Sequence, residues 1–270
     1  MSLARFAEPL PGDDPCGPDL LEADDDAFLD YYYDAIDRLP ARFFTDGKPF
    51  EPGSIAIDAE RGKVEALLER SRDLRPLAVL AQFAALAHRL PLLAETLSLM
   101  AELIERYPDQ VHPALANGIE ERQTALELLD SQVTMVLPLE HATLVEDKRL
   151  QKVTFRAYAV GTGQRGETAE EGGPDASAIV AALGAEPNAA QVDASYAALT
   201  AIRDGLKRIE AACLTADSRP FRPRFERLSP IVTQMVDLIA QARPDLGAAA
   251  PDPAAEAAAS DAEADDSAAG

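Results

Sequence analysis

The sequence predicts a mostly α-helical protein: an antiparallel helical bundle or helical layer, then a second small helical segment and a disordered acidic tail. Two features of the composition support this class. Hydrophobic residues make up 47% of the 270-residue chain, whereas aromatic residues make up only 6% and tryptophan is absent. Alanine and leucine supply the apolar content instead, and both are good helix formers. A third observation is that apolar residues recur every three or four positions, the spacing of one helix face, between segments marked by proline.

The first predicted helix follows a segment that cannot be helical, because residues 8–20 contain four prolines and two glycines. The helix should begin near Glu22, with three aspartates, residues 24–26, in its first turn, where they favour the helix dipole. Residues 40–57 hold three prolines and two glycines and are predicted to form a loop. The inner face of this first helix is predicted to comprise Phe28, Tyr32, Ala35, Ile36 and Leu39.

Four further helices are predicted before residue 137. Asp58 should cap the first of them, which runs to about Ser71; Asp73 should cap the second, with Pro76 in its first turn. Pro91 should open the third, and the fourth should run from about Glu120 to Val136. Their inward-facing residues are predicted to be Val64, Leu67 and Leu68; Leu77, Leu80, Ala81, Ala84 and Ala87; Leu93, Leu97, Met100, Ile104 and Tyr107; and Leu126, Leu129, Val133 and Val136.

A domain boundary is predicted after residue 160. Residues 150–160 alternate apolar and polar side chains, which favours a short strand or an extended segment. Residues 161–174 are rich in glycine and polar residues and are predicted to be a flexible linker. Residues 1–160 would then form the first helical domain.

Residues 175–244 are predicted to form a small second domain of three helices. A short helix should span 175–183 and a longer one about 188–214, whose apolar spacing is close to that of a coiled-coil seam. After a stiff turn at 219–225, a last helix should bury Leu228, Val232, Met235, Ile239 and Ala242. Residues 245–270 contain one large apolar residue, at their start, and are predicted to be a disordered acidic tail. The seam consists of Val192, Tyr196, Leu199, Ile202, Leu206, Ile209 and Cys213.

Charge and composition exclude several functional classes. The net charge is −22, from 47 acidic and 25 basic residues. A nucleic-acid-binding protein needs a basic surface to displace phosphate counterions, and anionic membranes are disfavoured for the same reason. The longest apolar run, residues 77–87, is about half the length of a membrane span. The N-terminus has no signal-like apolar stretch, so a cytoplasmic protein without membrane insertion is expected.

Glycines 161, 163 and 166 form a G-x-G-x-x-G pattern after the possible strand. A dinucleotide site also needs a helix that begins at the third glycine and directs its amides at the pyrophosphate. The residues that follow Gly166 have no apolar face and include three carboxylates, which would repel phosphate. We therefore interpret the pattern as part of the linker and predict no cofactor.

No other pattern indicates a catalytic or metal site. Cys16 lies in the Pro/Gly segment far from any histidine, and Cys213 lies on an apolar helix stripe. The aspartates 24–26 lack the alternating ligands of a calcium loop, and Glu65 and Glu69 near Arg61 and Arg72 resemble surface charge pairs. The three histidines, which lack the spacing of zinc ligands, are His88, His112 and His141.

Two stretches resemble the N-terminal region of the ImpA/TssA family of bacterial type VI secretion proteins. The first, PLPGDDPCGPDL at residues 9–20, is similar to the family's Pro-Gly-Asp-x-Pro-Cys-Gly-x-Asp-Leu segment. The second spans residues 67–113 and contains Ser-Arg-Asp-Leu-Arg at 71–75, a Leu-rich helix, a tyrosine at 107 and His-Pro at 112–113. The ALELLD and LPLEHATLV segments that follow also fit.

The resemblance implies a non-catalytic α-helical scaffold that docks to baseplate or sheathed-tail proteins. Longer members carry a C-terminal ring-forming domain, so a short form of the family is expected here. Two alternatives stay open: a stand-alone helical adaptor or chaperone-like binding module, and an enzyme whose site is assembled from dispersed residues. If the chain forms a homo-oligomer, residues 188–242 are predicted to mediate it, unless their two helices only close on each other.

Overall fold

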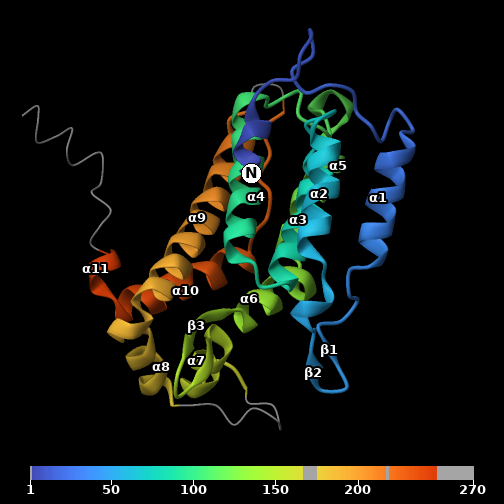
Figure 1. The fold of residues 1–270 in the computed structure, drawn as a ribbon. Coiled ribbons are helices and arrows are strands. Elements are labelled where there is room, and N and C mark those ends of the chain that lie inside the picture. Colours follow the sequence, from blue (N-terminus) through green and yellow to red (C-terminus); the bar gives the residue numbers. More distant parts are fainter. Residues whose placement is uncertain (1, 167–174, 217–218, 248–270) are drawn as a thin grey trace, which may run out of the picture.

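A computed structural model describes residues 2–166, 175–216 and 219–247, and these residues fold mostly into helices (Figure 1). The prediction of a mostly α-helical layer is confirmed. The main helices are α1 (Asp26–Asp37), α2 (Ile57–Leu68), α3 (Leu74–Leu86), α4 (Leu90–Arg106), α5 (Ile119–Glu127), α6 (Leu137–His141), α7 (Phe155–Gly161), α8 (Ala176–Leu183), α9 (Ala189–Leu214), α10 (Leu228–Ala242) and α11 (Pro244–Gly247). Two antiparallel hairpins pair β1 (Phe44–Thr45) with β2 (Lys48–Pro49) and β3 (Thr143–Asp147) with β4 (Gln151–Thr154).

Helix α3 is the centre of the layer. It contacts α4 on one side and α1 and α2 on the other, and α5 and α6 also pack on it. All 13 of its residues are buried. Its only uncharged polar side chain, Gln82, is satisfied because it accepts a 2.7 Å hydrogen bond from the hydroxyl of Thr134. More of this helix is therefore buried than the predicted single apolar stripe indicates, because neighbouring elements cover every face.

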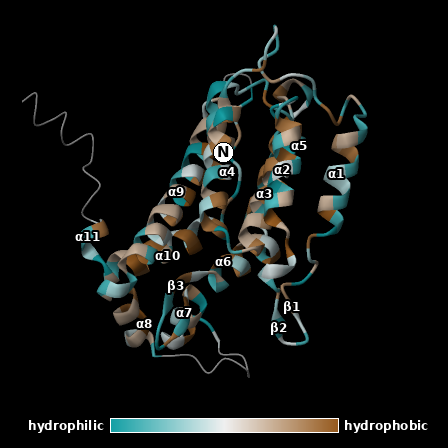
Figure 2. Ribbon diagram, in the orientation of Figure 1, coloured by the Kyte–Doolittle hydropathy of each residue, from teal (hydrophilic) through white to brown (hydrophobic). Residues whose placement is uncertain are grey.

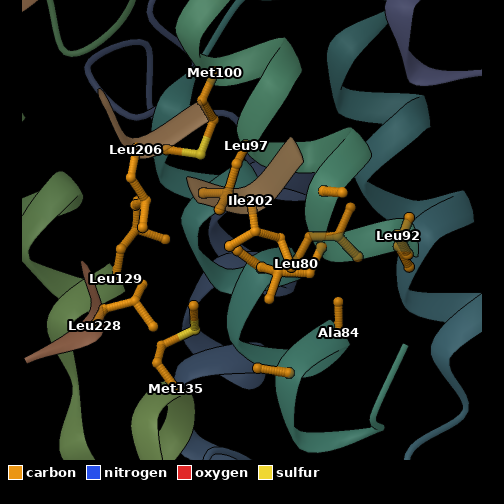
Figure 3. Close-up of a cluster of buried hydrophobic side chains, with 14 of the residues drawn as sticks. Leu80, Ala84, Leu92, Leu97, Met100, Leu129, Met135, Ile202, Leu206 and Leu228 are labelled. Carbon is orange, nitrogen blue, oxygen red and sulfur yellow. The ribbon is translucent and has the colours of Figure 1, made fainter. Parts of the chain in front are cut away.

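Helix α9 packs along α4, opposite to α3 (Figure 1). Figure 2 shows hydrophilic and hydrophobic residues side by side along α9, as expected for a helix with one buried face. Gly205 permits the close approach, because a Cβ at this position would lie 3.2 Å from the Cβ of Leu97. Figure 3 shows the shared core, in which side chains of α3, α4, α9 and α10 meet: Leu80, Leu97, Met100, Ile202, Leu206 and Leu228.

The segments on either side of the predicted linker thus share one hydrophobic core. Residues 167–174 of that linker, and residues 248–270 of the predicted tail, lie outside the described residues. Independent folding of 1–160 and 175–244 stays a prediction. The predicted oligomerisation seam on α9 packs within this chain, on α4 and α10, and six of its members are at most 1% exposed: Val192, Leu199, Ile202, Leu206, Ile209 and Cys213.

We expect Gly205→Leu to destabilise the whole chain by about 2 kcal/mol, because the new side chain would force α4 and α9 apart. Chemical denaturation should show one transition that shifts to lower denaturant. The matched control is Gly62→Leu, in α2, where no atom lies within 4 Å of the added Cβ. That change should be neutral or stabilising, because glycine is a poor helix former. An unchanged midpoint for Gly205→Leu would show that α9 is not held against α4 in solution.

Several predicted boundaries differ from the structure. Helix α1 begins at Asp26, and Tyr31 rather than Tyr32 joins Phe28 and Ala35 on its buried face; Ile36 is 36% exposed. The reason is that α1 lies at the edge of the layer, where α2 and α3 cover only a narrow stripe.

The predicted cap and the predicted strand also need correction. Helix α2 is preceded by Ala56, and Asp58 lies inside its first turn instead of capping it. Only residues 151–154 of the predicted extended segment are a strand. The hydroxyl of Thr154 then accepts a 3.1 Å hydrogen bond from the amide of Ala157 and starts α7.

The predicted helix 120–136 is interrupted at Ser131, whose backbone is extended. Ahead of it lie α5 and a 3₁₀ turn, Leu128–Asp130, and after it a π-helical turn, Gln132–Val136, that leads into α6. The carboxylate of Asp130 accepts hydrogen bonds from the amides of Arg227 and Leu228, at 3.0 and 2.8 Å. A contact with a distant segment therefore coincides with the break, and the local apolar period could not reveal it.

Candidate functional site

The proline-rich N-terminal segment is fastened to the turn between α2 and α3. The hydroxyl of Ser71 donates to the carbonyl of Pro18 at 2.8 Å, and the amide of Arg72 donates to the carbonyl of Cys16 at 2.8 Å. The guanidinium of Arg72 donates to the carbonyl of Glu8 at 2.7 and 3.1 Å. The two stretches that carry the family resemblance therefore form one unit in space.

A buried charged cluster lies beside this unit. Arg75 Nη2 is 2.6 Å from an oxygen of Asp73 and 2.5 Å from an oxygen of Asp19. His112 Nδ1 is 3.6 Å from the other Asp19 oxygen, and its Nε2 is 2.8 Å from the carbonyl of Gly17. Burial opposes the charge of Arg75, but its hydrogen bonds and ion pairs with Asp73 and Asp19 outweigh burial and raise its pKa. The cluster joins three segments that are far apart in sequence.

A third buried arginine, Arg122, stabilises the loop between α4 and α5. It is 1% exposed and donates to the carbonyls of Pro108, Val111 and Pro113, the last at 2.8 Å. Burial lowers its pKa to about 10. Sequence reasoning missed the roles of Asp19, Arg75 and Arg122. The available signal was Arg75, a charged residue in a helix whose other residues, apart from Gln82, are apolar.

A cavity of about 270 Å³ lies beside the charged cluster, between α1 and α5. Its wall includes Arg75 and Tyr32, and its other polar residues include Glu120 and Glu121. These two glutamates disfavour an anionic ligand there, since like charges repel at short range.

The outer face of α1 is a candidate docking surface. Helix α1 stands at one edge of the layer in Figure 1 and buries Phe28, Tyr31 and Ala35 against α2 and α3. On its outer face Tyr33 is 57% exposed and Ile36 is 36% exposed. Exposed aromatic residues are enriched in protein interfaces. The exposed carboxylates of the same helix are Asp26, Asp30, Asp34 and Asp37.

The glycine pattern lies at the end of a helix. Helix α7 ends at Gly161, Gly163 has a φ of 74°, and the amide of Arg165 donates to the carbonyl of Ala159 at 3.0 Å. This is a helix C-terminal turn, whose exposed groups are carbonyls rather than amides. The carboxylates after Gly166 fall outside the described residues.

The two cysteines are both buried, and burial raises the pKa of each thiol to about 12. Among the histidines, burial and the neighbouring His141 lower the pKa of His88 to about 4. Within the described residues, no group of three histidine, cysteine or acidic side chains could hold a metal ion.

The remaining candidates have structural partners. Asp25 caps α1 and pairs with Arg70, and the hydrogen bond from Arg70 lowers the pKa of Asp25. Glu65 pairs with Arg61 at 2.8 Å, as the surface pattern indicated. Arg72 and Glu69 depart from the surface pattern. Arg72 is buried on the N-terminal segment, and Glu69 pairs with Arg5 at 3.1 Å.

These features together define a helical domain with a fastened N-terminal segment and an exposed edge helix. Residues 7–131 match the family model described as ImpA, N-terminal, type VI secretion system. Residues 7–131 therefore carry an ImpA N-terminal region, which confirms the resemblance seen in the sequence.

The fold is also similar to a solved structure, the N-terminal domain, including the conserved ImpA_N region, of the TssA component of the type VI secretion system from Burkholderia cenocepacia. The TM-score is 0.61 and the sequence identity is 20%, over 90% of this chain and 93% of that chain. With this coverage, the similarity includes residues on both sides of the predicted boundary at 161–174. A comparison with curated proteins gives no match. No helix among the described residues is long and apolar enough to span a membrane.

Proposed function

We propose that this protein is a non-catalytic assembly component of a bacterial type VI secretion system and that it works in the cytoplasm. The ImpA N-terminal region at residues 7–131 supports the assignment to a type VI secretion system. The observation that supports a docking role is the outer face of α1, where Tyr33 and Ile36 are exposed between carboxylates. Its partner would be a baseplate or sheathed-tail protein with an apolar pocket bordered by basic residues.

We expect the double variant Tyr33→Ser/Ile36→Ser to bind such a partner at least tenfold more weakly, because it removes the apolar contacts at the centre of the surface. The measurement is biolayer interferometry of the purified chain against baseplate, sheath and tube proteins of the same bacterium. Leu214→Ser is the matched control, because Leu214 is 43% exposed at the end of α9, on another element.

Both variants should keep the Tm of the unmodified chain, since exposed substitutions change stability little. Equal weakening by Leu214→Ser, or no weakening by the α1 variant, would contradict docking through α1. A chain that binds none of these secretion proteins would contradict the proposed function itself.

A further inference from the structure

Four arginines lie in the extended segment between α9 and α10, residues 219–227. Along it, apolar side chains point inward and charged ones outward: Phe221, Pro223 and Phe225 are buried, whereas Arg222 and Arg224 are exposed. Arg219 and Arg227, at its two ends, are also exposed. We call these four residues the arginine row.

The backbone of the arginine row is fixed at Phe221 and at Arg227. The amide of Phe221 donates to the carbonyl of Cys213 at 3.1 Å, and the amide of Arg227 donates to Asp130 at 3.0 Å. The arginine side chains are therefore displayed on a rigid support, and a ligand need not order the backbone.

Most of the positive charge in the arginine row is not used in ion pairs with described residues and can bind a ligand. Arg224 pairs with Glu127 at 3.2 Å. Within the described residues, the side chains of Arg219, Arg222 and Arg227 take part in no ion pair. The adjacent cavity of about 330 Å³ has three carboxylates in its wall: Glu127 is held by Arg224 and Gln123, and Asp130 by backbone amides. The third, Glu226, is exposed within the segment, so residues 219–227 carry four positive charges and one negative charge. This segment is thus a positive site on a chain with a net charge of −22.

Residues 248–270 of the same chain have the complementary charge. They contain six carboxylates and no basic residue, and four of the carboxylates fall within six positions, 261–266. The chain that follows α10 is also long enough for the acidic segment to reach the arginine row. Helix α10 has 15 residues, so it carries the chain roughly 22 Å away from the arginine row. The 14 residues from Gly247 to Asp261 can span up to roughly 46 Å, about twice the distance needed.

We propose that the arginine row is a docking site for an acidic peptide segment and that its occupant is residues 252–266 of the same chain. Because both partners belong to one chain, the effective concentration of the acidic segment is in the millimolar range. At this concentration, several exposed ion pairs that are individually weak are enough to keep the acidic segment bound to the arginine row. The contact should weaken with salt, because the charges are exposed to solvent. This inference does not depend on the proposed secretion role.

The test uses the full chain, uniformly ¹⁵N-labelled, with a spin label attached at Ser267→Cys. Cys16 and Cys213 are at most 1% exposed, so the label should react selectively at the new position. We expect the label to broaden amide signals of residues 219–227 at low ionic strength, and the broadening to be lost at about 0.5 M salt.

Two charge-reversed variants locate the site. Arg222→Glu/Arg227→Glu should abolish the broadening, whereas Lys148→Glu/Arg149→Glu should preserve it, because it makes the same charge change at exposed residues of the β3–β4 turn. Broadening that survives the first variant, or that the second abolishes, would overturn the proposal. A mixture of spin-labelled ¹⁴N chain and unlabelled ¹⁵N chain distinguishes docking within one chain from docking between two copies. Broadening in that mixture would show that a second copy is the occupant and would also overturn it.

Discussion

Leu80→Asp should abolish cooperative folding of the chain at neutral pH. Leu80 is fully buried in α3, where Figure 3 shows it in the cluster that joins α3 to α4 and α9. The variant loses the burial of a leucine, about 2–5 kcal/mol, and places an unpaired carboxylate in an apolar core. Together these costs reach the total stability of a typical domain, about 5–15 kcal/mol. Circular dichroism should show no sharp thermal transition.

Leu80→Ala provides a graded second measurement, because it removes the contacts without adding a charge. It should keep a cooperative transition with a clearly lower midpoint, by about 2–5 kcal/mol. Leu214→Asp, at a position 43% exposed, is the control for the chemical change itself and should melt close to the unmodified chain. If Leu80→Asp also melted like the unmodified chain, the central position of α3 would be wrong.

Arg75→Met should lower the free energy of unfolding by about 3–5 kcal/mol, because two buried carboxylates would lose the cation that neutralises them. Asp19 and Asp73 lie 2.5 and 2.6 Å from Arg75, and the side chains of all three are at most 6% exposed. For a chain of this size the loss corresponds to a fall in Tm of roughly 10 °C. Differential scanning calorimetry would measure both quantities.

The double variant Arg75→Met/Asp19→Asn tests the mechanism. It should regain part of the lost stability, since it removes one of the two unpaired carboxylates, and the coupling should be clear in a double-mutant cycle. Arg70→Met is the matched control, because Arg70 pairs with Asp25 at a position 47% exposed and its loss should matter little. Equal effects of Arg70→Met and Arg75→Met would show that the cluster has no special role.

The helical class and the position of most helices could be predicted from the amino-acid sequence. Helices α3, α4, α8, α9 and α10 lie close to their predicted ranges, and Asp73 caps α3 as predicted, accepting a 2.8 Å hydrogen bond from the amide of Arg75. The motifs at 9–20 and 71–75 identified the family. These features are local, because helix periodicity, capping and proline effects depend on residues within about one turn of each other.

Which helix faces pack against each other could not be predicted from the sequence and was established by the three-dimensional structure. A periodic stripe says that a helix has an apolar face, but it does not say what covers that face. The coiled-coil-like spacing of α9 therefore fits a dimer seam, an intrachain pair with α10, or a contact with α4. In the structure α9 packs on both α10 and α4, and Gly205 permits the close approach to α4. The same limit applies to the charged cluster, in which Asp19 and Arg75 are 56 positions apart. Long-range contacts of this kind depend on how distant segments pack together, and no spacing along the chain encodes them.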